Sequence, residues 1–248
     1  MTCTTPYHYK RPKADITTDA VVFGLDLVGR KLKVLLIKRG RPGKVFYDHW
    51  AIPGGFLNIV PEGADGAEDL ETGCRRELEE ETGLTLSYLE QLYTFGKPGR
   101  DPRGRVITVA YWGIVRPDQV TVRGMDDAKE ARWFDVNELP DLAFDHADVL
   151  EVAVKRLRGK LRWAPVGVWL LPAEFTLTEL RSVYEIILGR EVDPSNFRKK
   201  IRPYLAKDNV LPPTGTRRKA AAGRPAALYT FNASAYQQLL RDGLDFEV

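Results

Sequence analysis

The segment from Asp65 to Gly83 restricts most strongly what this chain can fold into, because its sequence fits one amphipathic helix. Asp65 and Glu68 have the spacing of a capping box, and Gly83 is a typical residue after a helix end. A helix of this kind buries one face against the rest of a domain. The apolar residues at helical spacing are Ala67, Leu70, Cys74 and Leu78.

Carboxylates are concentrated on the same helix. Between Glu62 and Leu84 the sequence has nine acidic and two basic residues. At about 100° per residue, Glu77, Glu80 and Glu81 fall in one arc beside the apolar stripe. Like charges one turn apart repel each other, and a partly buried carboxylate is costly without a partner. We therefore expect a cation here, and oxygen ligands favour Mg²⁺, which often bridges to phosphate. The alternative interpretation is a solvated acidic face.

A longer pattern surrounds these carboxylates. It begins with Gly54-Gly55 and continues as Glu68-x7-Arg76-Glu77-Leu78-x-Glu80-Glu81-x-Gly83-Leu84. This pattern resembles the Nudix box of the Nudix hydrolase superfamily. The resemblance implies an α+β fold, the Nudix α/β/α sandwich with a mixed sheet, in which Gly54 and Gly55 shape a ligand-binding loop. It also implies that Glu77, Glu80 and Glu81 bind Mg²⁺ or Mn²⁺ against a diphosphate, while Arg76 orients a glutamate.

The loop between the glycines and the helix departs from the family pattern. Twelve residues separate Gly55 from Glu68, which is longer than the family usual, and an apparent insertion lies around residues 58–64. The helical half of the pattern is intact, whereas the loop that meets the substrate is not standard. The sequence therefore supports metal binding more directly than it supports turnover.

The reaction implied by the resemblance is hydrolysis of a nucleoside diphosphate linked to another group. Metal ions would neutralise the diphosphate and activate a water molecule, and a carboxylate would accept the proton. The residues implied in catalysis are Glu77, Glu80, Glu81, Arg76 and Glu130. Glu80, Glu81 and Glu130 are the candidates for the base, and the sequence does not rank them. A charge at a strand edge explains Glu130 equally well.

A second signal for anion binding is the turn-rich segment 96–105. Arg100, Arg103 and Arg105 have the planar fork that pairs with phosphate oxygens, although a solvated hairpin loop explains each of them as well. The segment continues into Val-Ile-Thr-Val-Ala-Tyr and resembles Nudix members that act on or sense ADP-ribose. ADP-ribose or a related nucleoside diphosphate is therefore the expected ligand. Three aromatic residues are candidates to stack its adenine or else belong to the core: Phe46, Trp50 and Trp133.

Hydrophobic patterns predict the other elements and two domains. In the first domain, residues 1–163, strands are expected at 19–27, 32–38, 89–95, 106–115 and 131–134, and a second helix at 145–161. In the second domain, residues 164–248, helices are expected at 176–188 and 193–206, strands at 210–212 and 227–231, and a last helix at 233–240. This second order of elements is that of a small winged helix-turn-helix domain.

Basic residues are concentrated in the second domain. From Ser195 to Arg224 there are nine basic residues and one acidic residue, so the net charge of +3 hides two regions of opposite sign. The helix at 193–206 has the position of a recognition helix, and the basic loop that follows has that of a wing. A small appendage with a solvated basic face is the alternative. The candidate DNA-binding residues are Ser195, Asn196, Arg198, Lys199, Lys200, Arg202, Arg217, Arg218, Lys219 and Arg224.

The chain from about Ala14 to Phe231 resembles the Nudix-related transcriptional regulators. The resemblance implies double-stranded DNA as a partner, a homodimer that matches paired half-sites, and repression of NAD-metabolism genes that ADP-ribose relieves. We consider three functions: such a regulator with an intact hydrolase site, a pyrophosphohydrolase whose winged helix is a structural appendage, and a sugar-responsive regulator without hydrolase activity. The sequence has two cysteines and no apolar run of membrane length, so we expect a cytoplasmic protein without a membrane partner.

Overall fold

The computed structural model describes residues 11–59, 66–116, 123–125, 128–162, 164–206, 209–219 and 225–242. The chain divides into two compact units. The first comprises Met1–Asp26 and Leu32–Arg156, and the second comprises Leu27–Lys31 and Leu157–Val248. None of the described helices combines the length and the hydropathy that a membrane span requires.

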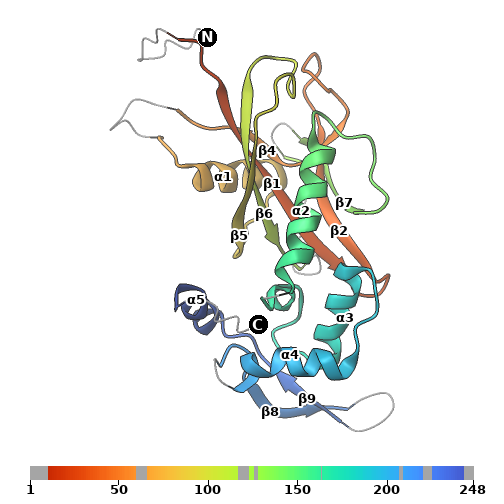
Figure 1. Cartoon of the computed structure of the whole chain (residues 1–248). Helices are drawn as coiled ribbons and strands as arrows, with labels where there is room; N and C mark the ends of the chain where they lie inside the picture. The colour runs from red at the N-terminus through yellow and green to blue at the C-terminus, as the bar shows by residue number, and fades with distance from the viewer. Residues whose placement is uncertain are drawn as a thin grey trace. The chain divides into compact units, whose positions relative to one another are not determined.

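The first unit is built on a mixed sheet (Figure 1), as the sequence predicts. Its strands are β1 (Asp15–Asp26), β2 (Lys31–Arg39), β3 (Trp50–Ala51), β4 (Gly54–Phe56), β5 (Leu89–Phe95), β6 (Val106–Ile114) and β7 (Ala128–Asp135). The strand order is β3-β2-β1-β6-β5, and β4 and β7 pair with β1 and β2. The β1–β6 pair is parallel, whereas β4 runs antiparallel to β1.

The apolar run of the central strand β1 is continuous rather than alternating, which is the pattern of a strand that is buried on both faces. Ala20 and Val22 share a core cluster with Cys74 and Leu78 of helix α1 (Leu70–Thr82). Val21 and Phe23 point to the other face and are also fully buried. Helix α2 (His146–Lys160) crosses in front of the sheet in Figure 1. The buried sheet therefore gives α1 a fixed position above β1.

Helix α1 begins later than the sequence predicts. Its N-cap is Asp69, whose side chain accepts a hydrogen bond from the Thr72 N–H at 2.8 Å. Asp65 of the expected capping box lies outside the described residues, and the Glu68 carboxylate accepts hydrogen bonds from Arg76 of the helix and from the Asn58 N–H in the loop after β4. The predicted end is confirmed: Gly83 has φ 69° and donates its N–H to the Glu79 carbonyl.

The second unit contains a winged helix. Its elements are the 3-10 helix η2 (Val166–Leu170), α3 (Leu177–Leu188), α4 (Pro194–Ala206), β8 (Pro213–Arg218), β9 (Ala226–Tyr229) and α5 (Ala233–Asp242). The capping box of α3 is confirmed, since Thr176 and Glu179 exchange both hydrogen bonds. The strand predicted at residues 210–212 is wrong. Val210 and Leu211 are instead buried in the core, and the first wing strand starts at Pro213.

Candidate functional site

A cavity of about 390 Å³ lies in the first unit, beside the start of β1 and the C-terminal half of α1. Strand β4 supplies one wall and an aromatic ring. The loops after β2 and after β5 supply arginines, and the loop before α2 supplies a second aromatic ring. The acidic residues that line it are Asp19, Glu77, Glu80, Glu81 and Asp101. The basic residues that line it are Arg39, Arg41, Lys44, Arg100 and Arg103, and His146 lines it as well.

The glycine pair of β4 brings backbone into contact with two glutamates of α1. The Gly54 N–H donates a hydrogen bond to Oε2 of Glu81 at 2.9 Å. A Cβ atom on Gly55 would lie 2.4 Å from the carboxyl carbon of Glu77, and one on Gly54 would lie 2.3 Å from the carbonyl oxygen of Thr18. A side chain at position 55 would therefore collide with Glu77 of α1, and one at position 54 would collide with strand β1.

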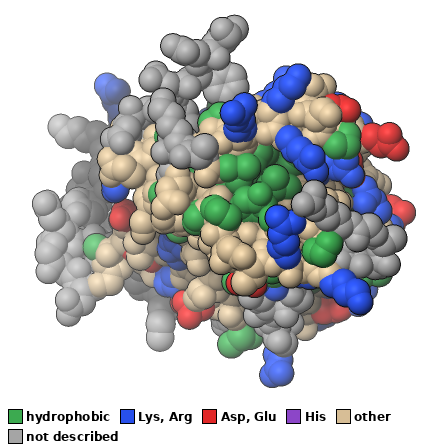
Figure 2. Space-filling model, turned by 90° about the horizontal axis from the view of Figure 1, so that it is seen from below, with side chains coloured by type: hydrophobic (Ala, Val, Ile, Leu, Met, Phe, Trp, Pro, Cys, Tyr) green, Lys and Arg blue, Asp and Glu red, His purple; other side chains and the backbone are tan. Residues whose placement is uncertain are grey.

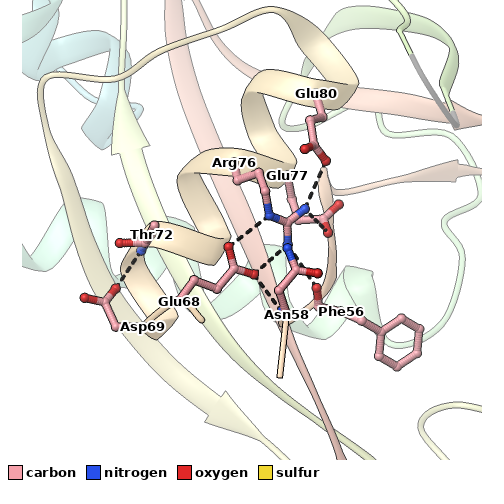
Figure 3. Close-up of polar contacts among 8 residues, drawn as sticks. All are labelled: Phe56, Asn58, Glu68, Asp69, Thr72, Arg76, Glu77 and Glu80. Carbon is pink, nitrogen blue, oxygen red and sulfur yellow. Dashed lines mark hydrogen bonds and ion pairs between the residues drawn. The ribbon is translucent and has the colours of Figure 1, made fainter. Parts of the chain in front are cut away.

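Arg76 links the carboxylates around it (Figure 3). Its Nε and Nη2 donate to the Glu68 carboxylate at 2.9 and 2.7 Å, and its Nη1 donates to Glu77 at 2.8 Å and to Glu80 at 2.9 Å. Its Nη2 also donates to the carbonyl of Phe56 at 3.1 Å. The hydrogen bonds from Arg76 hold the pKa of Glu68 below its ordinary value. Arg76 thus ties α1 to both the end of β4 and the loop after it.

Burial dominates the electrostatics of the two inner carboxylates. It raises the pKa of Glu81 to about 8, and it raises the pKa of Glu77 although Arg76 opposes that shift. Oδ2 of Asp19 is buried without a hydrogen-bond partner and lies 3.9 Å from Nη2 of Arg100. A set of buried oxygen ligands of this kind fits a hard divalent cation.

All three predicted metal ligands, Glu77, Glu80 and Glu81, line the cavity. Glu77 and the half-exposed Glu80 are both paired with Arg76. Across the described ranges, no group of three or more histidine, cysteine, aspartate or glutamate side chains has the arrangement of a metal site. The residue types fit a divalent cation, and Arg76 takes the place of a cation between Glu77 and Glu80.

Two of the three predicted phosphate-binding arginines line the cavity, and both are already paired. Arg100 is buried and donates two hydrogen bonds to Asp145, at 2.9 and 2.7 Å. Arg103 pairs with Asp101. Arg105 is exposed and does not line the cavity. It directly precedes β6, and its carbonyl accepts a hydrogen bond from the Asp15 N–H.

The structure also leaves Glu130 outside the cavity. Its side chain lies on β7, pairs with Arg132 and is about two-fifths exposed, which fits a strand-edge charge. Phe46, Trp50 and Trp133 are not lining residues either, whereas Phe56 and Phe144 are.

Sequence reasoning missed several lining residues. Asp19 was detectable as a carboxylate inside an apolar strand. His146 carried no signal, because only the fold brings it to Ile52, whose N–H donates to Nδ1 at 2.9 Å. Burial lowers the pKa of His146, so its imidazole is neutral at pH 7.

In the winged helix, α4 has one buried and one basic face. Phe197, Ile201 and Tyr204 are buried in the core of the unit. The predicted DNA-binding residues of this helix are all exposed: Ser195, Asn196, Arg198, Lys199, Lys200 and Arg202. The sequence therefore placed the basic face correctly.

A hollow of about 700 Å³ lies between α4, the start of α3 and β9. Arg198, Lys199 and Arg202 line it together with apolar residues such as Leu177 and Leu205. Figure 2 looks at this end of the molecule and shows hydrophobic side chains surrounded by Lys and Arg. Such a surface suits a polyanion better than an apolar partner.

The wing residues differ from the prediction. Arg217 and Arg218 lie in β8, opposite Ala227 and Ala226, rather than in a loop. Arg218 donates to Glu179 at 2.7 Å and to the Glu174 carbonyl at 3.0 Å. Arg217 and Lys219 are exposed, and the predicted contact Arg224 lies outside the described residues.

Two family models match the chain. Residues 17–153 match the NUDIX domain, and residues 167–231 match the NrtR DNA-binding winged helix domain. The chain belongs to the Nudix family and carries an NrtR-type winged helix after its Nudix domain. This assignment confirms the predicted fold class.

Similar proteins share both parts or one part. The chain is 34% identical over 227 residues to the ADPR responsive transcriptional repressor NtrR of Acinetobacter baylyi, covering 91% of this chain and 85% of that protein. The crystal structure of Shewanella oneidensis NrtR complexed with a 27mer DNA is 32% identical with a TM-score of 0.71, covering 90% of this chain and 95% of that one. An ADP-ribose pyrophosphatase of Methanocaldococcus jannaschii is 38% identical over 125 residues, covering 50% of this chain and 68% of that protein.

Proposed function

We propose that this protein is a transcriptional repressor that binds double-stranded DNA through its winged helix and releases it when ADP-ribose binds the Nudix cavity. The observation that carries this proposal is that one chain has both a charged cavity and an exposed basic face on α4. The cavity is lined by Glu77, Glu81, Arg100 and Arg103. The similarity to an ADPR responsive repressor over 91% of the chain supports the same proposal. NAD-metabolism genes are the proposed targets.

In the proposed interface, contacts on α4 and contacts on the wing have different roles. The exposed residues Ser195, Asn196, Lys199 and Lys200 would reach base edges, which would specify sequence. Arg217 and Lys219 would contact phosphates and add affinity without specificity. We also propose a homodimer, because paired half-sites require two winged helices.

The DNA half of the proposal is tested with fluorescence anisotropy. Duplex DNA from upstream of the protein's own gene should bind more tightly than a scrambled duplex of the same length. ADP-ribose should weaken the specific complex, while ribose 5-phosphate should not. Equal affinity for both duplexes would remove the regulator function, and release by a free sugar instead of ADP-ribose would favour a sugar-responsive regulator.

A second proposed function is hydrolysis of ADP-ribose to AMP and ribose 5-phosphate. The observation that favours it is the intact carboxylate set on α1, with Glu77 and Glu81 facing the cavity. A divalent cation such as Mg²⁺ or Mn²⁺, held by Glu77, Glu81 and Glu80, would neutralise the diphosphate and lower the pKa of a bound water. Water would attack one phosphorus, a P–O bond of the diphosphate would break, and a carboxylate would accept the proton.

The chain's own residues would keep this arrangement in place. Arg76 holds Glu77 through Nη1, and the Gly54 N–H holds Oε2 of Glu81. We favour Glu80 or Glu81 as the base over Glu130, which pairs with Arg132 on β7. A cation held by all three glutamates would compete with Arg76 for Glu77 and Glu80, because Nη1 of Arg76 donates to both.

Hydrolysis is tested by following AMP release from ADP-ribose in the presence of Mg²⁺. Glu81→Gln should abolish turnover, whereas Glu79→Gln on the exposed face of the same helix should not. If the wild-type protein releases no AMP, the Nudix cavity senses its ligand without hydrolysing it. Turnover without specific DNA binding would instead favour a pyrophosphohydrolase with a structural winged helix.

A further inference from the structure

The turn between β1 and β2 belongs to the second unit and not to the first. Its residues Leu27–Lys31 cluster with the winged helix, although the rest of both strands clusters with the sheet. The tip of the turn is open to solvent, since Val28 is 97% exposed. Arg30 instead reaches helix α3, where its Nη2 donates a hydrogen bond to Oε2 of Glu185 at 3.3 Å. One side chain of this turn is therefore a partner of the winged helix.

Glu185 holds the segment that joins α3 to α4. Its backbone carbonyl accepts the N–H groups of Gly189 at 2.9 Å and of Arg190 at 3.3 Å, and its Oε1 accepts the Val192 N–H at 3.3 Å. Nε of Arg181 lies 3.5 Å from the same Oε1. Groups at a helix end need such partners because the helix itself does not supply them. Glu185 thus fixes the turn through its backbone and its side chain together.

The same turn sets where α4 begins. Val192 is followed by Asp193, whose side chain accepts the Asn196 N–H at 2.8 Å and whose carbonyl accepts the Phe197 N–H at 3.0 Å. Asp193 therefore caps α4. Because Val192 directly precedes this cap, the Glu185 carboxylate holds the chain immediately before the helix that carries the proposed base contacts.

The two strands that flank the Arg30 turn both line the Nudix cavity. Thr17 and Asp19 of β1 line it, and so do Ile37 and Arg39 of β2. A close-packed interior has low compressibility and transmits small displacements. A ligand that shifts these strands would therefore act on the turn that carries Arg30.

We propose that Arg30 is a positioning residue that links the Nudix cavity to the turn between α3 and α4. This inference rests on the proposed function and assigns the route by which ADP-ribose regulates DNA binding. In the ligand-free protein Arg30 holds the Glu185 carboxylate, and the turn places α4 for DNA. ADP-ribose shifts β1 and β2, and Arg30 then releases Glu185. The Arg30 side chain is 56% exposed, and exposed ion pairs are weak, so this pair opens without unfolding of either element.

The test measures affinity for the specific duplex by fluorescence anisotropy, with and without saturating ADP-ribose. In Arg30→Ala the affinity without ADP-ribose should fall about two- to fivefold, the range for one exposed ion pair. The affinity with ADP-ribose should stay the same, so the ratio of the two affinities falls by that factor. A merely structural role, or loss of the positive charge alone, would lower both affinities equally and leave this ratio unchanged.

Four further variants serve as controls. Arg30→Lys keeps the charge and should retain most of the affinity ratio, and Val28→Ala alters the exposed tip of the same turn and should not change it. Glu185→Gln keeps an acceptor for the Val192 N–H but removes the charge, so it should lower the ratio at least as much as Arg30→Ala. Adding Arg30→Ala to Glu185→Gln should have no further effect, because the two side chains form one interaction. Arg30→Gln keeps the test valid if Arg30→Ala does not fold.

The outcomes separate this inference from the function on which it rests. If ADP-ribose releases DNA from the wild-type protein and Arg30→Ala leaves the affinity ratio unchanged, the link through Arg30 is wrong and the proposed regulation stands. Additive effects of Arg30→Ala and Glu185→Gln would also overturn the link. If ADP-ribose does not release DNA from the wild-type protein, the proposed regulation fails and the link fails with it.

Discussion

The Gly54 N–H donates its hydrogen bond to Oε2 of Glu81, a buried carboxyl group whose pKa is raised to about 8. The contact joins the backbone of β4 to the last turn of α1. Burial is the dominant cause of the shift, and the hydrogen bond opposes it only in part. At pH 7 the cation-free protein therefore holds a proton on Glu81, and cation binding must release it.

The first prediction concerns pH and follows from this proton. Between the ordinary pKa of 4.5 and about 8, the folded chain retains the Glu81 proton, whereas the unfolded chain has lost it. The free energy of unfolding without metal should thus fall by a few kcal/mol as pH rises from about 5 to about 8, and then level off.

Urea unfolding at three pH values measures this change in the free energy of unfolding. Glu81→Gln should flatten the profile and Glu79→Gln should not, and an unchanged slope in Glu81→Gln would contradict the prediction. Mg²⁺ should stabilise the wild-type protein more at high pH, because it replaces the proton.

The second prediction concerns the space between β4 and α1. In Gly55→Ala the new methyl group would lie 2.4 Å from the Glu77 carboxyl carbon, so the end of that side chain must move. We expect at least about tenfold weaker Mn²⁺ binding by calorimetry, since supporting contacts of a metal site are worth about 10- to 100-fold. Gly104→Ala is the control, because a Cβ atom there meets nothing within 4 Å. Unchanged Mn²⁺ affinity would show that Glu77 is not a ligand.

The third prediction concerns the ion pair of Arg100 and Asp145. The Arg100 side chain is 4% exposed and that of Asp145 is 17% exposed. Asp145→Asn would leave a buried guanidinium whose remaining ion pair, within the part of the chain that the structure describes, is with Asp19 at 3.9 Å. We expect the free energy of unfolding to fall by about 3 kcal/mol, measured by the urea midpoint. Glu151→Gln breaks the exposed pair with Lys155 on the same helix and should cost less than about 0.5 kcal/mol. Equal effects of the two variants would refute the argument from burial.

The fourth prediction separates the two wing arginines. Arg217→Ala should lower DNA affinity uniformly across sequences and reduce the slope of affinity against salt by about one phosphate contact. Arg218 instead joins β8 to the start of α3 through Glu179 and the Glu174 carbonyl. Arg218→Ala should therefore lower thermal stability of the winged helix, and Glu179→Gln should reproduce part of that loss. The interpretation fails if Arg218→Ala changes only the salt slope and leaves the melting temperature unaltered.

The sequence by itself determined the elements whose signals are local. The Thr176–Glu179 capping box, Gly83 after α1 and the exposed basic face of α4 all depend on residues within a few positions of each other, and the structure has them as predicted. The sequence also placed Glu77, Glu80 and Glu81 in one arc of the helix, because a helix fixes which side chains share a face, and all three line the cavity.

Only the tertiary structure decided which distant groups share the cavity and which cations are already neutralised. Asp19, Phe144 and His146 line the same cavity as the carboxylates of α1 because the sheet, the loop before α2 and the start of α2 bring them there, and no local spacing encodes this. The arginines of segment 96–105 look equivalent in the sequence. In the fold, Arg100 pairs with Asp145 and Arg103 pairs with Asp101, whereas Arg105 does not line the cavity, because partner choice depends on which carboxylates the fold brings within reach.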